Sequence, residues 1–359
     1  AAANSCVVTM ADSFPIDLSK YQKVPIDPFS KATLSAEEKA AIKANIQLCR
    51  DAIVFFTACG AANGHGGHTG GAFDTVPEVV LLDSFFQARP DKFVPILFDE
   101  AGHRVATQYL FSALKGKLPA AHLKNYRVGH AHLPGHPELG CTPGVEFSSG
   151  RLGHMWPMVN GWCFANPDKI SICLGSDGSQ QEGNDAEAAR LAVARKLNVK
   201  LVIDDNNVTI AGHPEDYLKG YDVTKTLEGH GVKCVAVDGE DVDALYAGLR
   251  TAMTTEGPFA VVAKRKMCPG VKGVEGECHG HDVIALAKAV DYLTERNYTE
   301  AVAWLNGPAK KAAKDPQTEY LGTKGSPYNS NRNTFGDAVC KVLAKLPEAE
   351  RKRRVMVID

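Results

Sequence analysis

The chain of 359 residues is long enough for one large α/β domain with attachments. With 44% hydrophobic and 23% charged residues, its composition excludes disordered, collagen-like and coiled-coil classes. Forty Lys and Arg against 42 Asp and Glu give a net charge of -2, which supplies no basic footprint for nucleic acid. No run approaches the roughly 20 apolar residues that a membrane helix needs. Neither nucleic acid nor a membrane is therefore an expected partner.

The cysteines and the first residues bear on the compartment. Ten cysteines are scattered without a CxxC pair, which is typical of reduced core thiols in a reducing compartment. We therefore expect a cytoplasmic protein. The alternative is an organelle stroma or matrix after removal of a transit peptide, because the chain opens with AAANSC and no Met.

The N-terminal part is expected to hold an arm and one long helix. Residues 1–34 are predicted to be extended, since Pro15, Pro25 and Pro28 interrupt regular structure. Ser35 and Glu38 then form the pattern of a capping box, and apolar residues follow at steps of three and four. A Gly/His-rich loop over 60–73 ends this helix.

From about residue 160, short β-rich runs alternate with helical stretches. The alternation predicts an α/β fold with a doubly wound parallel sheet and helices on both faces. Ligands bind beyond the carboxyl ends of the strands in such sheets, so the turns after residues 174 and 204 are the candidate site. The expected strands are 169–174, 200–204, 232–237 and 259–263, and the expected helices are 185–197, 224–230 and 241–255.

The C-terminal part is expected to be a linker followed by the start of another domain. Residues 305–331 are rich in Lys, Ala, Pro, Gly and Ser, as linkers are. A helix over 334–346 and a strand over 355–358 follow, and the basic run 351–354 indicates a solvated helix end. One helix and one strand make no core, so residues 332–359 are interpreted as an incomplete domain.

Two strand ends carry the residues that suggest a ligand. Asp177 and Gly178 follow the first predicted strand in a turn that matches neither GxGxxG nor the P-loop pattern. Asp204 and Asn206 follow the next strand. Carboxylate and amide oxygens at neighbouring strand ends suit a hard cation such as Mg²⁺ that holds a diphosphate, and the Gly178 N–H could donate to that anion. The alternative for Asp177 is a simple helix N-cap.

An ordered set of motifs extends this pattern and resembles the transketolase family. The resemblance implies a thiamine-diphosphate-binding fold, with a diphosphate-binding domain over 35–304 and the start of a pyrimidine-binding domain over 332–359. The motifs run in family order: GHTGGA from Gly67, GH from Gly102, LPGHPE from Leu133, PGVEFSSGRLG from Pro143, DGxxxEG from Asp177 and IDDNxVTIxG from Ile203.

The resemblance also implies roles for single residues. A metal, Mg²⁺ or Ca²⁺, would be bound by Asp177, Asn206 and the carbonyl of Val208. His68, His103 and His136 would be catalytic. Phosphorylated sugar would contact His68, His136 and Arg332. The residues expected to bind thiamine diphosphate are His103, Gly150, Leu152, Asp177, Gly178, Glu182, Asn206, Ile210 and His279.

The implied activity is transfer of a two-carbon ketol unit from a ketose phosphate to an aldose phosphate, a step of the pentose phosphate pathway. In the family, Glu182 corresponds to a buried glutamate that links two cofactor sites across a homodimer, and an essential glutamate lies in the second domain. We therefore expect a homodimer or a complementary chain that carries the pyrimidine-binding domain. The alternatives are another thiamine-diphosphate reaction, as in deoxyxylulose-phosphate synthase or 2-oxoacid decarboxylase and dehydrogenase components, and a non-catalytic interaction protein of the same fold.

Some residues depart from the family pattern. Ser176 replaces a glycine, His154 stands where Gln is frequent, and only His279 matches the later His-x-x-His-Gly motif. Zinc ligation is an alternative use of the histidines, although neither spacing is a standard one. The two possible zinc sets are His130, His132 and His136, and Cys268, Cys278, His279 and His281.

Overall fold

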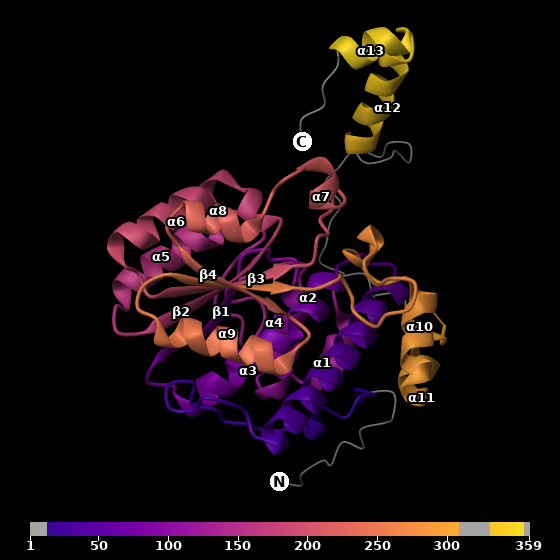
Figure 1. Ribbon diagram of the computed structural model, residues 1–359. Coiled ribbons are helices and arrows are strands. Elements are labelled where there is room, and N and C mark those ends of the chain that lie inside the picture. The colour runs from indigo at the N-terminus through magenta and orange to yellow at the C-terminus, as the bar shows by residue number, and fades with distance from the viewer. Residues whose placement is uncertain (1–12, 309–330, 355–359) are drawn as a thin grey trace. The chain divides into compact units, whose positions relative to one another are not determined.

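The computed structural model describes residues 13–308 and 331–354, which belong to two units, 1–313 and 314–359. In the first unit, five parallel strands form one sheet in the order β1-β2-β3-β5-β4 (Figure 1). This arrangement confirms the predicted α/β class. The strands are β1 (Phe93–Asp99), β2 (Ile170–Ser176), β3 (Val199–Asp205), β4 (Lys233–Asp238) and β5 (Phe259–Lys264).

Helices cover both faces of the sheet (Figure 1). One face packs against α1 (Ala36–Ala62), α3 (Val76–Ala88), α4 (Val105–Leu114) and α9 (Val242–Thr254). The other face packs against α5 (Met155–Ala165), α6 (Gly183–Arg195) and α8 (Val223–Gly229). The remaining helices of this unit are α2 (Gly70–Asp74), α7 (Pro214–Tyr217), α10 (Leu286–Glu295), α11 (Thr299–Leu305) and the 3-10 turns Leu18–Lys20, Ala120–Asn125, Ser179–Gln181 and Cys278–Gly280.

Alternate residues of the central strands pack into the two hydrophobic cores, one on each face of the sheet. On β3, Leu201 and Ile203 lie in the core beneath α5, α6 and α8, whereas Val202 lies in the core beneath α1 and α9. This alternation follows from the period-two geometry of a strand, and it explains why the buried runs are apolar throughout.

The predicted first helix is confirmed, and its start has the expected cap. The Ser35 hydroxyl accepts from the Glu38 N–H at 3.2 Å, and the Glu38 carboxylate accepts from the Ser35 N–H at 2.8 Å. The described part of the N-terminal segment lies against this domain: Ile16 and Ile26 are buried, and the Ile26 N–H donates to the Ser84 carbonyl at 3.1 Å.

The register of the sheet brings the candidate turns together. Ser176 of β2 pairs with Asp204 of β3, and Asp205 pairs with Lys264 of β5. The carboxyl ends of these three strands are therefore level, and the loops that leave them lie side by side at one edge of the sheet.

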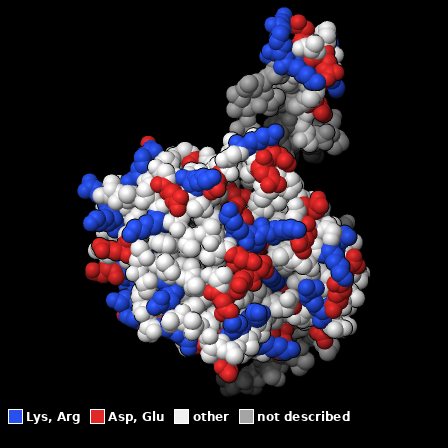
Figure 2. Space-filling view, in the orientation of Figure 1, with Lys and Arg blue, Asp and Glu red and all other residues white. Residues whose placement is uncertain are grey.

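The second unit contains α12 (Asn331–Leu343) and α13 (Glu348–Arg354). The first corresponds to the predicted helix over 334–346, and Arg354 of α13 pairs with Glu350 at 2.5 Å. The predicted strand over 355–358 lies outside the described residues. Over the described chain, no helix has the length and apolar character needed to cross a bilayer. On the face shown in Figure 2, basic and acidic side chains are interspersed.

Candidate active site

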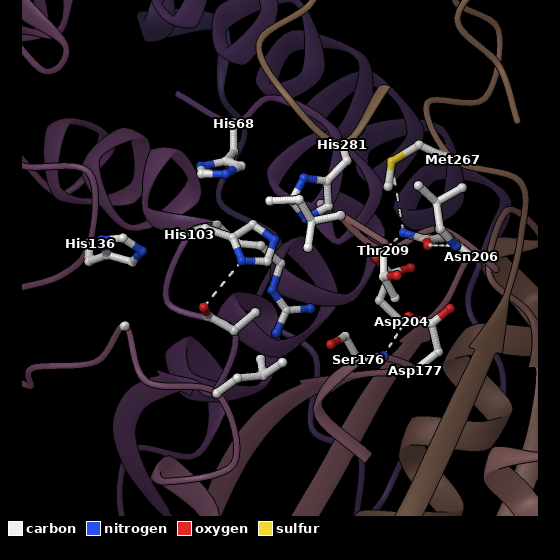
Figure 3. Close-up of a pocket in the computed structure, with 18 residues that line it drawn as sticks. His68, His103, His136, Ser176, Asp177, Asp204, Asn206, Thr209, Met267 and His281 are labelled. Atoms are coloured by element: carbon white, nitrogen blue, oxygen red, sulfur yellow. Dashed lines mark hydrogen bonds between the residues drawn. The ribbon is translucent and has the colours of Figure 1, made fainter. Parts of the chain in front are cut away.

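A pocket of about 240 Å³ lies at the carboxyl ends of β2 and β3 (Figure 3). Loops that follow α1, β1, β2 and β3 all contribute to its wall, although they are far apart in the sequence. Most of the predicted site residues line it, namely His68, His103, His136, Gly150, Leu152, Asp177, Gly178, Asn206, Val208 and Ile210.

The turn after β2 leaves one carboxylate oxygen uncommitted. Asp177 Oδ1 accepts from the Gly178 N–H at 2.8 Å, whereas Oδ2 is buried and has no hydrogen-bond partner among the described residues. Burial, Asp204 and Asp205 raise the pKa of Asp177 well above its usual value. A buried carboxylate of this kind is costly unless a cation neutralises it, so Asp177 is a candidate metal ligand.

Ser176, the residue that replaces a glycine, has a specific use in this turn. Its hydroxyl accepts from the Ser179 N–H at 3.0 Å, and the Ser179 hydroxyl accepts from the Ser176 N–H at 2.8 Å. The reciprocal pair holds residues 176–179 as a closed turn, so the serine is compatible with the loop that a diphosphate would approach.

On the neighbouring strand end, the amide of Asn206 is held in one orientation. Its Nδ2 donates to Asp74 Oδ2 and to Asp204 Oδ2, each at 3.0 Å. Its Oδ1 accepts from the Val208 N–H at 3.0 Å. Because both hydrogens of Nδ2 are committed, Oδ1 is the atom available to a cation.

A buried arginine neutralises part of the acidic charge behind Asn206. The Arg265 side chain is fully buried and pairs with Glu78 and, at 3.3 Å, with Asp204. It also donates to the main-chain carbonyl of Asp74. Asp74, Glu78 and Asp204 together contain more carboxylates than the single guanidinium of Arg265 balances. This excess favours a further positive charge in the pocket.

A second buried arginine joins the loop after β1 to the end of β2. Arg104 donates to Asp99 Oδ1 at 2.8 Å and to the carbonyls of Leu174 and Gly175 at 2.7 and 2.8 Å. It follows His103 in the sequence, so this anchor fixes the histidine relative to the turn that carries Asp177.

On the side of the pocket opposite Asp177, the wall is formed by the imidazole rings of His68, His103 and His281 (Figure 3). The ring centroids of His68 and His103 are 4.8 Å apart, as are those of His103 and His281. Burial lowers the pKa of His68 to about 4 and that of His103 well below its usual value. The rings are therefore neutral near pH 7. The Nδ1 atom of His103 lies 3.2 Å from the Ala101 carbonyl, which makes Nδ1 the donor and leaves Nε2 as an acceptor facing the pocket.

The segment around Gly150 reaches the pocket by a close backbone approach. Gly150 has φ +136°, and a Cβ there would lie 2.9 Å from the His136 ring. A Cβ on Gly102 would lie 2.6 Å from the Gly150 nitrogen. Side chains at these two positions would separate the loops, so glycine is required at both for His136 and Leu152 to line the same cavity.

Three predicted residues do not line the pocket. Glu182 is exposed in the single chain, and the buried position implied by the resemblance belongs to a homodimer. His279 is also exposed, and its Nε2 lies 3.2 Å from the Gly273 carbonyl. Arg332 lies on α12, where its side chain is outside the described part. In the single chain, the side chains of Glu182 and His279 both leave their loops on the solvent side.

The comparison with protein families decides the family. The model described as "Transketolase, thiamine diphosphate binding domain" matches residues 47–297. This chain belongs to that family.

Relatives within the family differ in how much of their length the chain covers. This chain is 29% identical over 245 residues to one subunit of an apulose-4-phosphate transketolase from Actinobacillus succinogenes. The match covers 64% of this chain and 87% of that protein. The chain is 29% identical over 259 residues to "Transketolase, chromosomal" of Cupriavidus necator, covering 66% of this chain but only 38% of that protein.

Solved transketolase structures are likewise matched over only part of their length. The transketolase of Campylobacter jejuni superposes with a TM-score of 0.61 at 25% identity, covering 72% of this chain and 46% of that one. The transketolase of Leishmania mexicana has the same fold, with a TM-score of 0.61 at 20% identity, covering 84% of this chain and 48% of that one. The chain thus spans about half the length of these transketolases.

Some residues in and behind the pocket of this transketolase-family domain were not predicted as site residues. Arg104, which lines the pocket, directly follows the GH motif, and Asp74, which lies behind Asn206, comes two residues after GHTGGA, but neither residue belongs to its motif. His281 appeared only in the zinc alternative, two residues after His279. The run Cys278–His279–Gly280–His281 offers two histidines, and only the conformation of the turn decides which ring faces the pocket.

Proposed function

We propose that this chain provides the diphosphate-binding half of a transketolase, which transfers a two-carbon ketol unit from a ketose phosphate to an aldose phosphate. One observation carries the proposal: a single pocket combines the oxygen donors Asp177 and Asn206 with the neutral rings of His68, His103 and His136. The first pair suits a metal-bound diphosphate, and the three rings suit proton transfer at sugar hydroxyls.

The residues fit thiamine diphosphate with a hard divalent cation, Mg²⁺ or Ca²⁺. The uncommitted Oδ2 of Asp177, the oriented Oδ1 of Asn206 and the carbonyl of Val208 would hold the cation. Such an ion takes its remaining ligands from water and from the diphosphate. Gly178, Gly150, Leu152 and Ile210 would contact the cofactor, because they line the same cavity.

The histidines would handle protons of the sugar. When bound, thiamine diphosphate supplies the nucleophilic carbon and the electron sink for cleavage of a carbon–carbon bond. His103 can accept a hydroxyl proton at Nε2, because Nδ1 is held by the Ala101 carbonyl. His68 is neutral and would bind a donor-sugar hydroxyl, as would His136. The low pKa values keep all three rings able to accept near neutral pH.

A second polypeptide part would complete this site. The chain covers about half of the transketolases above, and a relative of which it covers 87% is named as one subunit of its enzyme. Helices α5 and α6 also present exposed apolar side chains beside the turn of Glu182: Met158 is 54% exposed, Trp162 40% and Leu191 42%. This face would be covered by a complementary chain or by a second copy, which would also bury Glu182.

The test is reconstitution. Residues 1–359 are titrated with thiamine diphosphate and Mg²⁺ by calorimetry, with and without a chain that carries the pyrimidine-binding domain. Turnover is then measured with a ketose-phosphate donor and an aldose-phosphate acceptor. We expect ketol transfer only from the mixture. Release of CO₂ from a 2-oxoacid, with no ketol transfer, would overturn the assignment within the thiamine-diphosphate enzymes.

A further inference from the structure

Two histidines lie on the wall of the pocket opposite Asp177, and an exposed aspartate follows one of them. His68 precedes α2, and His281 follows the turn Cys278–Gly280. Their ring centroids are 5.1 Å apart with the ring planes perpendicular, and Asp282 is the next residue along the chain. Neither of the two zinc sets considered from the sequence includes His68 or Asp282.

The two loops that carry these residues are fastened together. The Thr69 N–H donates to the Asp282 carbonyl at 3.2 Å, and the Ile284 N–H donates to the Thr69 hydroxyl at 3.3 Å. A Cβ on Gly70 would collide with the carbonyl of Gly280, so the backbones touch. The positions of His68 and His281 relative to each other are therefore set by the fold before any ligand arrives, which is the condition for a built site.

Both imidazoles have a nitrogen that no hydrogen bond uses. The Nδ1 atoms of His68 and His281 are buried and have no hydrogen-bond partner among the described residues. The Nδ1 of His281 lies 3.6 Å from Asp282 Oδ1. An imidazole whose Nδ1 carries no proton has a lone pair at that atom, as a metal ligand must.

One ligand atom each from His68, His281 and Asp282 lies within 4.8 Å of the other two. We propose that these three residues form a site for a divalent cation of the zinc class, separate from the oxygen site at Asp177. Ligands held about 2.0–2.2 Å from Zn²⁺ must be closer together than 4.8 Å, so the group contracts on binding. The Asp282 side chain is 69% exposed and can rotate onto the cation.

The donor set determines which metal the site takes. Imidazole nitrogen suits Zn²⁺, Co²⁺, Ni²⁺ and Cu²⁺, whereas Mg²⁺ and Ca²⁺ prefer oxygen. The pocket would therefore hold two cations of different chemistry on opposite walls. Two histidines and one carboxylate leave a fourth position open, which water or a sugar hydroxyl can occupy.

A cation at this site would occupy His68, which the proposed function assigns to the donor sugar. If that function is right, zinc-class metals inhibit in competition with the donor. This consequence rests on the proposed function, whereas binding of the metal itself does not. The experiment below therefore omits thiamine diphosphate and sugar and reads only the metal.

The probe is Co²⁺, whose visible absorption is stronger in four-coordinate nitrogen and oxygen surroundings than in six-coordinate oxygen surroundings. Residues 1–359 are stripped with a chelator, saturated with Mg²⁺ to fill the oxygen site, and titrated with Co²⁺; Zn²⁺ is then added as a competitor. We expect one equivalent of Co²⁺ in a four-coordinate spectrum, displaced by Zn²⁺. In His281→Ala and Asp282→Asn, the affinity should fall by at least about tenfold.

The matched control is His279→Ala, which removes an exposed histidine from the same turn and should leave the titration unchanged. Asp177→Ala should also leave it unchanged. Asp282→Asn changes an exposed side chain, so its affinity for Co²⁺ can still be measured if His281→Ala does not fold. Absence of Co²⁺ binding in the wild type, or an equal loss of affinity in His279→Ala, or a loss in Asp177→Ala alone, would overturn the proposal.

Discussion

The amide nitrogen of Asn206 lies 3.0 Å from a carboxylate oxygen of Asp74, a residue 132 positions earlier in the chain. Asp74 sits at the end of α2 and is fully buried, and its other oxygen accepts from the Cys268 N–H at 2.8 Å. Burial and Asp204 raise its pKa well above the usual value. Asp74 does not line the pocket, so it can act there only by orienting Asn206.

We expect Asp74→Ala to weaken cation-dependent binding of thiamine diphosphate by about 10–100-fold, the usual effect of losing a partner that orients a metal ligand. Calorimetry with Mg²⁺ measures the change. The control is Asp51→Ala, which removes an aspartate that is also buried and that accepts from Tyr292 and Tyr298, each at 2.9 Å, away from the pocket. That variant should lose unfolding free energy at unchanged affinity. Equal losses of affinity in both variants would contradict a positioning role.

Asp177→Ala should abolish cofactor binding without lowering the stability of the metal-free chain. The carboxylate is the proposed metal ligand whose Oδ2 is uncommitted, yet burial and the charges of Asp204 and Asp205 make it unfavourable when no cation is bound. Calorimetry and urea unfolding measure the two quantities. Asp205→Ala is the matched control, since Asp205 does not line the pocket and lies 3.9 Å from Lys264. Unchanged cofactor affinity in Asp177→Ala would refute the metal assignment.

The sequence could predict four of the five strands, and the oxygen donors at the ends of two of them, because both depend on local patterns, whereas the pocket histidines were expected only from the resemblance to the transketolase family. Apolar runs bounded by Asp177 and Asp204 identify strands and their ends without any tertiary information. β1 was not predicted, since Pro95 interrupts its run and its turn signals are weak. Asp74 and Arg265 also escaped prediction, because their roles exist only through contacts between residues far apart in the chain.

A buried acid pair beneath the turn after β2 should make stability depend on pH. Burial and the neighbouring Glu100 carboxyl raise the pKa of Asp185 to about 10. The unfolded chain releases this proton near the ordinary value of 3.8, whereas the folded chain keeps it. The contribution of Asp185 is therefore complete below that value and is lost as the pH rises towards about 10.

From roughly pH 6 to 9, we expect the unfolding free energy of the wild type to fall more steeply than that of Asp185→Asn. Asparagine can still accept from Gln180, which donates to Asp185 at 2.8 Å, and can donate to Glu100. Urea unfolding across this range measures the slopes. Glu187→Gln, an exposed change on the same helix, should keep the wild-type slope. Parallel curves for the wild type and Asp185→Asn would show that the pair holds no extra proton.

His103→Ala and His136→Ala should lower ketol-transfer turnover in the reconstituted enzyme by about 10²–10⁴-fold, the usual contribution of a general acid or base. Although the resemblance implies that His103 also contacts the cofactor, cofactor affinity should fall far less than in Asp177→Ala, because neither ring lies among the oxygen donors at Asp177 and Asn206. Steady-state kinetics and calorimetry on the same samples separate the two effects. Joint loss of cofactor and metal from both variants would assign these histidines to structure instead.

The last prediction separates two histidines of one turn. The family motif points to His279, whereas the structure places the ring of His281 in the pocket, 4.8 Å from that of His103. His281→Ala should therefore raise the KM for the donor sugar or lower kcat, and His279→Ala should leave both unchanged, because its ring is exposed and lies beside the Gly273 carbonyl. Kinetics of the two variants in the reconstituted enzyme decide the matter. The reverse result would mean that the turn Cys278–Gly280 rotates when the complementary part binds, exchanging one imidazole for the other.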